Sequence, residues 1–161
     1  MIYKTVSLLL LFTSFCSCNK ISSQKELHMP SSSMEPTIPR DSVIIVDKTS
    51  YQKKDPERFD IVTFTPPTDA EASFIFRVIG LPNEAIEITK EGPSINGKTI
   101  SLPDGVVLSV EKEAPHHKLK LGEGQYYLMG DNTKNALDSR YFGPVKREAI
   151  LGKVIEIKKE P

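Results

Sequence analysis

Short apolar runs separated by polar breaks extend from residue 43 to the C-terminal end of the chain. The runs are rich in β-branched and aromatic residues, and Pro, Gly, Asn or Asp interrupts them, which is typical of β-strands. We predict strands at residues 43–46, 61–64, 74–79, 85–88, 106–110, 126–129 and 150–157. The 12 prolines leave little room for long helices, and only residues 146–149 suggest even a short one.

One dipeptide indicates how neighbouring strands are joined. Asn96 and Gly97 form the Asn-Gly pair that favours a type I′ turn, which connects antiparallel strands in a hairpin. Short strands and tight turns together predict an all-β fold made of antiparallel sheets.

A polar segment precedes the first of these strands. Residues 30–43 read PSSSMEPTIPRDSV, so small hydroxyl residues and a proline turn lead directly into the apolar run. This arrangement is able to present one serine on a turn at the start of a strand. Taken alone, the segment fits an ordinary polar linker equally well, because a single short motif often occurs by chance.

The segment resembles the serine box of the type I signal peptidases, in which the serine before Met is the nucleophile. Three further segments resemble boxes of the same family in the same order, at residues 58–64, 76–82 and 130–145. Residues 95–98 match the hairpin tip that the family has between them. The resemblance extends from about residue 29 to residue 153 and implies the β-fold of the signal peptidases.

The resemblance also implies roles for single residues. Ser33 would be the nucleophile, and Ser31 together with the backbone N–H of Ser33 would bind the oxyanion. Met34 would form an apolar wall of the substrate pocket. The implied ligand is an extended signal-peptide segment of an exported protein, which would add to a sheet edge beside Ser33.

Two positions depart from the family pattern. Bacterial members have a lysine, and the eukaryotic type a histidine, where this chain has Phe76. Ala136 occupies the position at which the family usually has a serine bonded to that lysine. A serine hydroxyl needs a neighbouring group to take its proton, and phenylalanine cannot do this. The proton acceptor and its supporting group are therefore both missing from their usual positions.

Three other residues are candidates for a substitute base. Lys134 belongs to a loop that is expected beside Ser33, whereas His116 and His117 have a suitable intrinsic pKa but follow a proline in a connector. The simpler interpretation of both histidines is a solvated loop. Arg77 is too basic to accept a proton.

The remaining charged residues of the boxes are predicted to shape the site. Arg77, Asp131, Asp138 and Arg140 resemble the ion pairs and hydrogen bonds of the family better than they resemble catalytic groups. Removing one partner of such a buried pair leaves the other charge stranded, so these residues are expected to act together.

The N-terminus has the order of an export signal. A lysine at position 4, an apolar stretch at residues 6–15 and then Ser17 and Cys18 match the bacterial lipoprotein pattern. We predict a signal at residues 1–18 with Cys18 lipidated, a polar tether at residues 19–28 and a catalytic-type domain at residues 29–158. The lipid would hold the protein on the extracytoplasmic side of a membrane in the bacterial cell envelope. A secretory signal cleaved elsewhere and a short uncleaved anchor are the alternatives, since about ten apolar residues are too few to span a bilayer.

Composition narrows the possible functions. The formal net charge is +0 and there is no basic stripe, which argues against nucleic-acid binding. Both cysteines lie in the leader, so the mature domain is expected to have no disulfide and no thiol chemistry, and we predict no cofactor and no metal. Two functions remain: a membrane-anchored serine endopeptidase that cleaves signal peptides, or a pseudopeptidase that binds extended peptides or a partner peptidase.

Overall fold

The fold was analysed in a computed structural model, which describes residues 23–103, 105–108 and 116–158. Its elements follow one another as β1 (Gln24–His28), β2 (Val43–Asp47), β3 (Ile61–Phe64), β4 (Phe74–Gly80), β5 (Ala85–Thr89), β6 (Gly92–Ile95), β7 (Lys98–Thr99), β8 (Lys118–Lys120), β9 (Gln125–Met129), α1 (Ser139–Phe142), β10 (Val145–Lys146), the 3-10 turn η1 (Arg147–Ala149) and β11 (Ile150–Lys158). The all-β prediction is confirmed.

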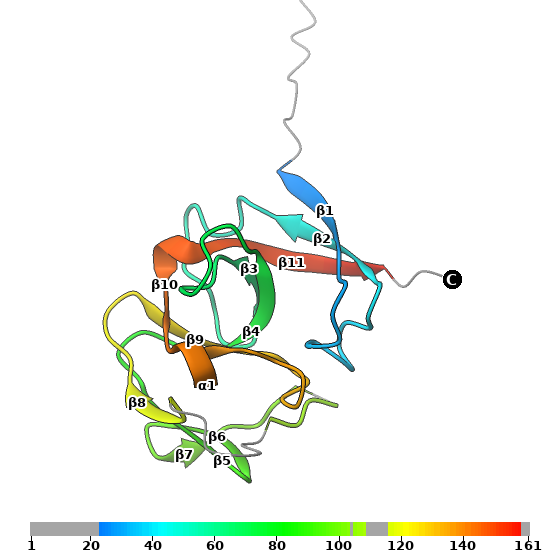
Figure 1. The fold of residues 1–161 in the computed structure, drawn as a ribbon. Helices are drawn as coiled ribbons and strands as arrows, with labels where there is room; N and C mark the ends of the chain where they lie inside the picture. Colours follow the sequence, from blue (N-terminus) through cyan, green and yellow to red (C-terminus); the bar gives the residue numbers. More distant parts are fainter. Residues whose placement is uncertain (1–22, 104, 109–115, 159–161) are drawn as a thin grey trace, which may run out of the picture.

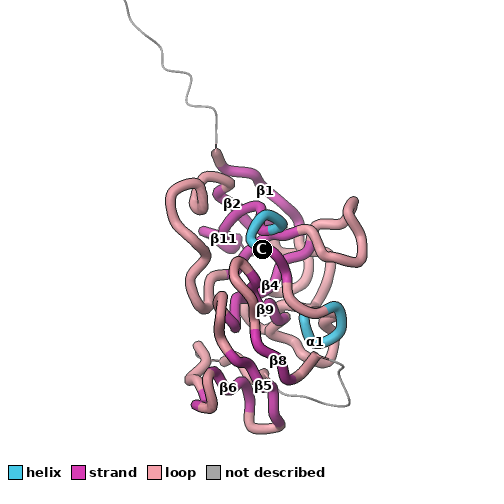
Figure 2. The backbone as a smooth tube through the Cα atoms, turned by 90° about the vertical axis from the view of Figure 1, so that its left-hand side faces the viewer, coloured by secondary structure: helices cyan, strands magenta, loops and turns pink. Residues whose placement is uncertain are grey.

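The strands form two antiparallel sheets. The larger has the order β1-β2-β11-β3-β4-β9-β10 and the smaller the order β7-β6-β5-β8. Figure 1 shows the two sheets at opposite ends of the molecule, with β4 and β9 leading from one towards the other, and Figure 2 shows the same arrangement from the side.

Strands β4 and β9 each contribute side chains to both hydrophobic cores. Successive side chains of a strand point to opposite faces. Accordingly, Val78 and Leu128 belong to the core of the larger sheet, whereas Ile79, Tyr127 and Met129 belong to the core of the smaller one. This sharing fixes the two sheets against each other and gives β4, which carries Phe76, a buried position.

The hairpin prediction is confirmed in detail. Ile95 pairs with Lys98, so the loop between β6 and β7 has two residues. Asn96 has φ 50° and Gly97 has φ 78°, the two positive values that a type I′ turn requires. The side-chain oxygen of Asn96 also accepts a hydrogen bond from the backbone N–H of Ala85 at 2.9 Å.

Six of the seven predicted strands are present, and the short helical segment at residues 146–149 appears as η1. The strand at residues 106–110 is wrong for Val106 to Leu108, which pair with no strand. Val106 instead closes a turn by donating its N–H to Pro103, and both Val106 and Leu108 are buried in the smaller core. Val106 and Leu108 are apolar because they are buried in this core, and the sequence pattern of such residues resembles that of a strand.

The predicted tether at residues 19–28 is wrong for its second half. Gln24–His28 is strand β1, which pairs with β2 along its whole length, from Gln24 opposite Asp47 to His28 opposite Val43. The strand is polar because it lies at the edge of the sheet, where most of its side chains are exposed.

The predicted signal and the lipidation site Cys18 lie outside the described residues. Within the described ranges, no helix has the length and apolar character that crossing a membrane requires.

Candidate active site

The loop between β1 and β2 holds the candidate nucleophile in place. The loop is closed at its base by hydrogen bonds from the N–H of Met29 to Ser42 at 2.9 Å and from the N–H of Asp41 to Met29 at 2.7 Å. Met34 and Ile38 are fully buried, and the N–H of Ile38 donates to the carbonyl of Met34 at 2.8 Å. The buried side chain of Met34, which directly follows Ser33, therefore anchors this loop. Met34 was expected to form an apolar wall of the substrate pocket, but it does not line the groove beside Ser33.

Ser31 and Ser33 lie together near the start of this loop, residues 29–42, which we call the serine loop. Their hydroxyl oxygens are 2.8 Å apart, and the backbone N–H of Ser33 points at the Ser31 hydroxyl at 3.2 Å. Ser33 is 8% exposed. The Ser31 hydroxyl and the Ser33 N–H, the two groups that the family resemblance assigns to oxyanion binding, thus lie next to each other, and in this structure they are hydrogen-bonded to one another.

A second loop, which follows β9, holds the serine loop from the other side. The N–H of Asn132 donates to the carbonyl of Ser33 at 3.0 Å, and the side-chain amide of Asn132 donates to the carbonyl of Ser32 at 3.1 Å. The role of Asn132 was not predicted from the sequence, although it lies in the segment that resembles the family's C-terminal box.

Gly130 lies where Ser33, Phe76 and Ala136 come close to one another. A Cβ atom added there would lie 2.6 Å from the carbonyl oxygen of Ser33, 3.1 Å from Cε1 of Phe76 and 2.5 Å from the Cβ of Ala136. The structure therefore brings together Ser33, Phe76 and Ala136, as the family resemblance implied. Because these contacts are so close, only glycine fits between them.

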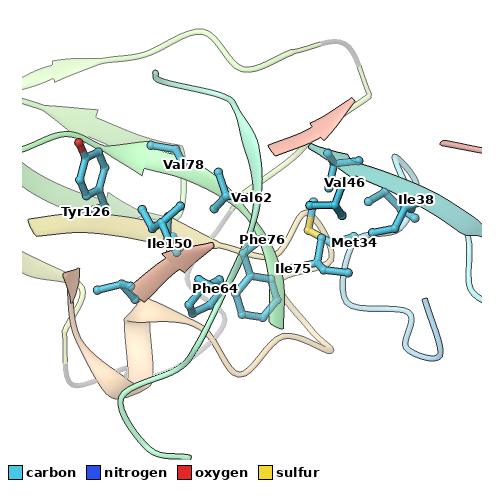
Figure 3. Packing of buried hydrophobic residues seen from close by; sticks show 14 of the residues in the cluster. Met34, Ile38, Val46, Val62, Phe64, Ile75, Phe76, Val78, Tyr126 and Ile150 are labelled. Atoms are coloured by element: carbon cyan, nitrogen blue, oxygen red, sulfur yellow. The ribbon is translucent and has the colours of Figure 1, made fainter. Parts of the chain in front are cut away.

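The Phe76 side of this meeting point is apolar. Phe76 is 3% exposed, and its ring centroid lies 5.7 Å from that of Phe64 and 5.9 Å from that of Phe74. Figure 3 shows Phe64 and Phe76 side by side in the core, with Met34 beyond Ile75. Neither Phe76 nor the buried Ala136 offers an atom that could accept a proton from Ser33.

A groove of about 470 Å³ opens beside Ser33. Its walls come from β1, the serine loop, the start of β4 and the loop after β9, and the lining residues are Lys25, Leu27, His28, Met29, Pro30, Ser31, Ser33, Ser73, Phe74, Ile75, Phe76, Asn135 and Leu137. Of the described strands, only β2 pairs with β1. Residues 74–76 of β4 pair with β3, whereas the pairing of β4 with β9 begins at Arg77. Two strand edges are therefore available to an extended peptide in this groove.

The first of two buried ion pairs links β4 to the serine loop. Arg77 donates from Nε to Oδ1 of Asp131 at 2.8 Å and from a terminal nitrogen to Oδ2 at 2.5 Å. The hydroxyl of Thr37 in the serine loop also donates to Oδ2 of Asp131. The pair therefore connects the residue after Phe76 with the loop that carries Ser33.

The second ion pair shapes the loop after β9. Asp138 caps α1 by accepting from the N–H of Arg140 at 3.1 Å, and its other oxygen accepts from the N–H of Gly130 at 3.1 Å. Nε of Arg140 donates to Asp138 at 2.8 Å. Burial raises the pKa of the Asp138 carboxyl, and its bonds to Arg140 act in the opposite direction. Neither carboxylate of the two pairs lines the groove.

The residues considered as substitute bases do not line the groove with Ser33. Lys134 borders a different depression together with Glu35 and Asp131. His116 lies against Gly143 at the end of α1, and His117 is an exposed residue before β8. The groove instead includes Lys25 and Leu27, which belong to the segment predicted as a tether. In the described part of the chain, no cluster of three or more His, Cys, Asp or Glu residues is placed to hold a metal ion.

The fold and site define a two-sheet β-protein with a serine loop beside a peptide-sized groove. Residues 2–157 match the family model described as "Signal peptidase, peptidase S26". The chain is 37% identical over 131 residues to a probable signal peptidase I-2 of Synechocystis sp., covering 78% of this chain and 59% of that protein. It is 34% identical over 131 residues to signal peptidase I V of Bacillus subtilis, covering 74% of this chain and 77% of that protein.

A solved structure shows the same fold. The crystal structure of a signal peptidase I from Enterococcus faecalis matches with a TM-score of 0.52 and 30% identity, covering 63% of this chain and 98% of that one. The chain therefore belongs to the type I signal peptidase family. Because it spans only 59% of the length of the Synechocystis relative, its activity and substrates do not follow from membership alone.

Proposed function

We propose that this chain is a signal peptidase I-type serine endopeptidase that cleaves signal peptides of exported precursors, with Ser33 as the nucleophile. The observation that carries the proposal is the arrangement of Ser31 and Ser33 in the serine loop. The Ser31 hydroxyl and the Ser33 N–H lie together beside a groove that two open strand edges border.

The reaction would follow from this geometry. A precursor segment binds in extended form, and main-chain hydrogen bonds to the edges of β1 and β4 position one of its carbonyl groups at Ser33. Oγ of Ser33 bonds to the carbonyl carbon, and the oxygen that becomes negative is held by the Ser31 hydroxyl and the Ser33 N–H. The C–N bond then breaks, the amine leaves with a proton from water, and a second water hydrolyses the acyl ester.

Proton transfer is the weak step of this sequence. Phe76 and Ala136 accept no proton, so in this proposal the proton of Ser33 passes to water or hydroxide. Oxyanion stabilisation and binding alone leave roughly 10³- to 10⁴-fold catalysis over water in serine proteases that have lost triad members. We expect turnover of this low order.

The location of the reaction is part of the same proposal. Lipidation at Cys18 would place the domain on the extracytoplasmic side of the membrane, where cleavage sites of exported precursors emerge. Bacterial lipoproteins carry several acyl chains, and more than one chain is needed for stable anchoring.

One observation favours a second candidate function. Phe76 packs against Phe64 and Phe74, so an aromatic cluster occupies the position of the proton acceptor. A relative that has lost its chemistry would keep the groove and bind extended peptides, or hold a partner peptidase, without cleaving them.

Both candidates are separated by one experiment on the full chain in detergent. A fluorogenic signal-peptide substrate is incubated with the wild type and with Ser33→Ala, and peptide binding is followed by fluorescence anisotropy. Slow turnover that disappears in Ser33→Ala supports the peptidase. Equal rates for the wild type and Ser33→Ala, with peptide binding retained, identify a relative that binds peptides without cleaving them. An absence of peptide binding contradicts both candidate functions.

A further inference from the structure

The groove beside Ser33 has a one-sided charge. Its lining includes Lys25 and His28, which are able to carry positive charge, but no Asp or Glu. The buried carboxylates of Asp131 and Asp138 are engaged by arginines and lie outside the lining.

Lys25 is placed to act on a ligand in this groove. Side chains alternate along a strand, so Lys25 and Leu27 share one face of β1, and both line the groove together with Met29, which follows the strand directly. Glu26 lies on the other face, where Lys158 is 3.5 Å from its carboxylate. Lys25 is exposed, and the described residues give it no ion pair.

The groove has an apolar part and a cationic end. Leu27, Met29, Phe74, Phe76 and Leu137 form the apolar part close to Ser33. Lys25 lies further along β1, four positions before Met29, a separation of about 13 Å at the usual rise of a strand. A peptide that adds to the edge of β1 advances by the same rise, so Lys25 lies opposite a residue about four positions from the one beside Met29.

We propose that Lys25 is a specificity-determining residue that selects extended peptides with an acidic side chain remote from the bond at Ser33, about four positions from the residue bound beside Met29. The residues between this acidic side chain and the bond are apolar, in accordance with the floor of the groove. The inference rests on the proposed peptide-binding function and names the ligand class of that same groove. Binding, rather than cleavage, is the property that it concerns.

The test is a charge scan measured as binding. A capped, fluorescent apolar decapeptide receives a single Glu, Gln or Lys at each position in turn, and dissociation constants are determined for the full chain carrying Ser33→Ala. The same scan is repeated with Lys25→Glu added, and with Lys98→Glu as the matched control. Lys98 lies on β7 of the smaller sheet and is equally exposed, so its reversal changes net charge without changing the groove.

We expect one peptide position, the one that lies opposite Lys25, at which Glu binds roughly two- to fivefold more tightly than Gln, the range of exposed ion pairs. Lys25→Glu should reverse this preference in favour of Lys, Lys98→Glu should leave it unchanged, and 0.5 M salt should weaken it. Binding without a Glu preference, or a preference that survives Lys25→Glu, overturns the role of Lys25 while the proposed function stands. A failure of all peptides to bind contradicts both.

Discussion

The two sides of the active site differ sharply in chemistry. On one side, Ser31 and Ser33 keep a polar arrangement that the backbone of the serine loop and Asn132 hold in place. On the other, Phe76 and Ala136 present only carbon atoms within an aromatic core. The comparison teaches that the placement of Ser31 and Ser33 depends on loop hydrogen bonds, whereas a proton acceptor would depend on two side chains that the fold does not require to be polar.

The largest effect is expected when the apolar side is made polar. Phe76→Lys combined with Ala136→Ser should raise turnover of a fluorogenic signal peptide by roughly 10²- to 10⁴-fold, the usual contribution of a general base. Burial of the new amine among apolar groups should lower its pKa, so that neutral amine is available near pH 7.

The control is Phe76→Met with Ala136→Ser, which has a flexible side chain but no amine. This variant should show no gain. If the lysine variant is folded by circular dichroism and is no faster than the methionine variant, the two sides do not form one catalytic unit in this chain.

The connection between the two sides is expected to have a large effect on stability. Asp131→Ala removes the partner of Arg77 and leaves a buried charge unpaired, which should cost about 3–5 kcal/mol of unfolding free energy. Denaturant unfolding measures this loss. Glu87→Ala breaks the exposed pair with Lys118 and should cost less than about 1 kcal/mol. Similar losses for both variants would show that the Arg77–Asp131 pair does not join the two sides.

The polar side alone is tested by removing one oxyanion donor. In the Phe76→Lys, Ala136→Ser background, where turnover is measurable, Ser31→Ala should lower kcat by roughly 10²-fold. Ser73 also lines the groove but lies at the start of β4, so Ser73→Ala should change kcat less than about twofold. Equal effects of the two changes would deny Ser31 its role.

The smallest effect is expected at Lys134. It borders a different depression from the groove of Ser33, so Lys134→Ala should change wild-type turnover by less than about twofold. A loss of tenfold or more, with folding intact, would identify Lys134 as a proton acceptor and would remove the contrast between the two sides.

The sequence predicts the fold well where strands are buried. The runs at β2, β3, β4 and β9 combine β-branched or aromatic residues with clear breaks, and the Asn96-Gly97 turn has a local cause. β1 escaped prediction because an edge strand with exposed side chains has no apolar pattern. At Val106 and Leu108 a strand was predicted but is absent, since apolar loop residues that fill a core have the same sequence pattern as a strand.

The site is predictable only as far as local motifs reach. The motifs placed Ser33, Phe76 and Ala136 together, and the contacts around Gly130 agree. The groove face formed by Lys25, Leu27 and Met29 could not be recognised without β1, because it depends on the register of an edge strand. Asn132 donates hydrogen bonds to the backbone carbonyls of Ser32 and Ser33. The sequence does not show which backbone carbonyl a side chain will contact, so this role could not be predicted.

The pH dependence of wild-type turnover tests most directly whether the proton acceptor is absent. Initial rates of fluorogenic peptide cleavage are measured from pH 6 to pH 10, with the Ser33→Ala rate subtracted at each pH. If no protein group accepts the proton of Ser33, kcat/KM should rise in proportion to hydroxide. Its logarithm should then increase linearly with pH and reach no plateau, whereas the Phe76→Lys, Ala136→Ser variant should level off. A wild-type profile that levels off between pH 6 and pH 9 would reveal a protein base and contradict the account.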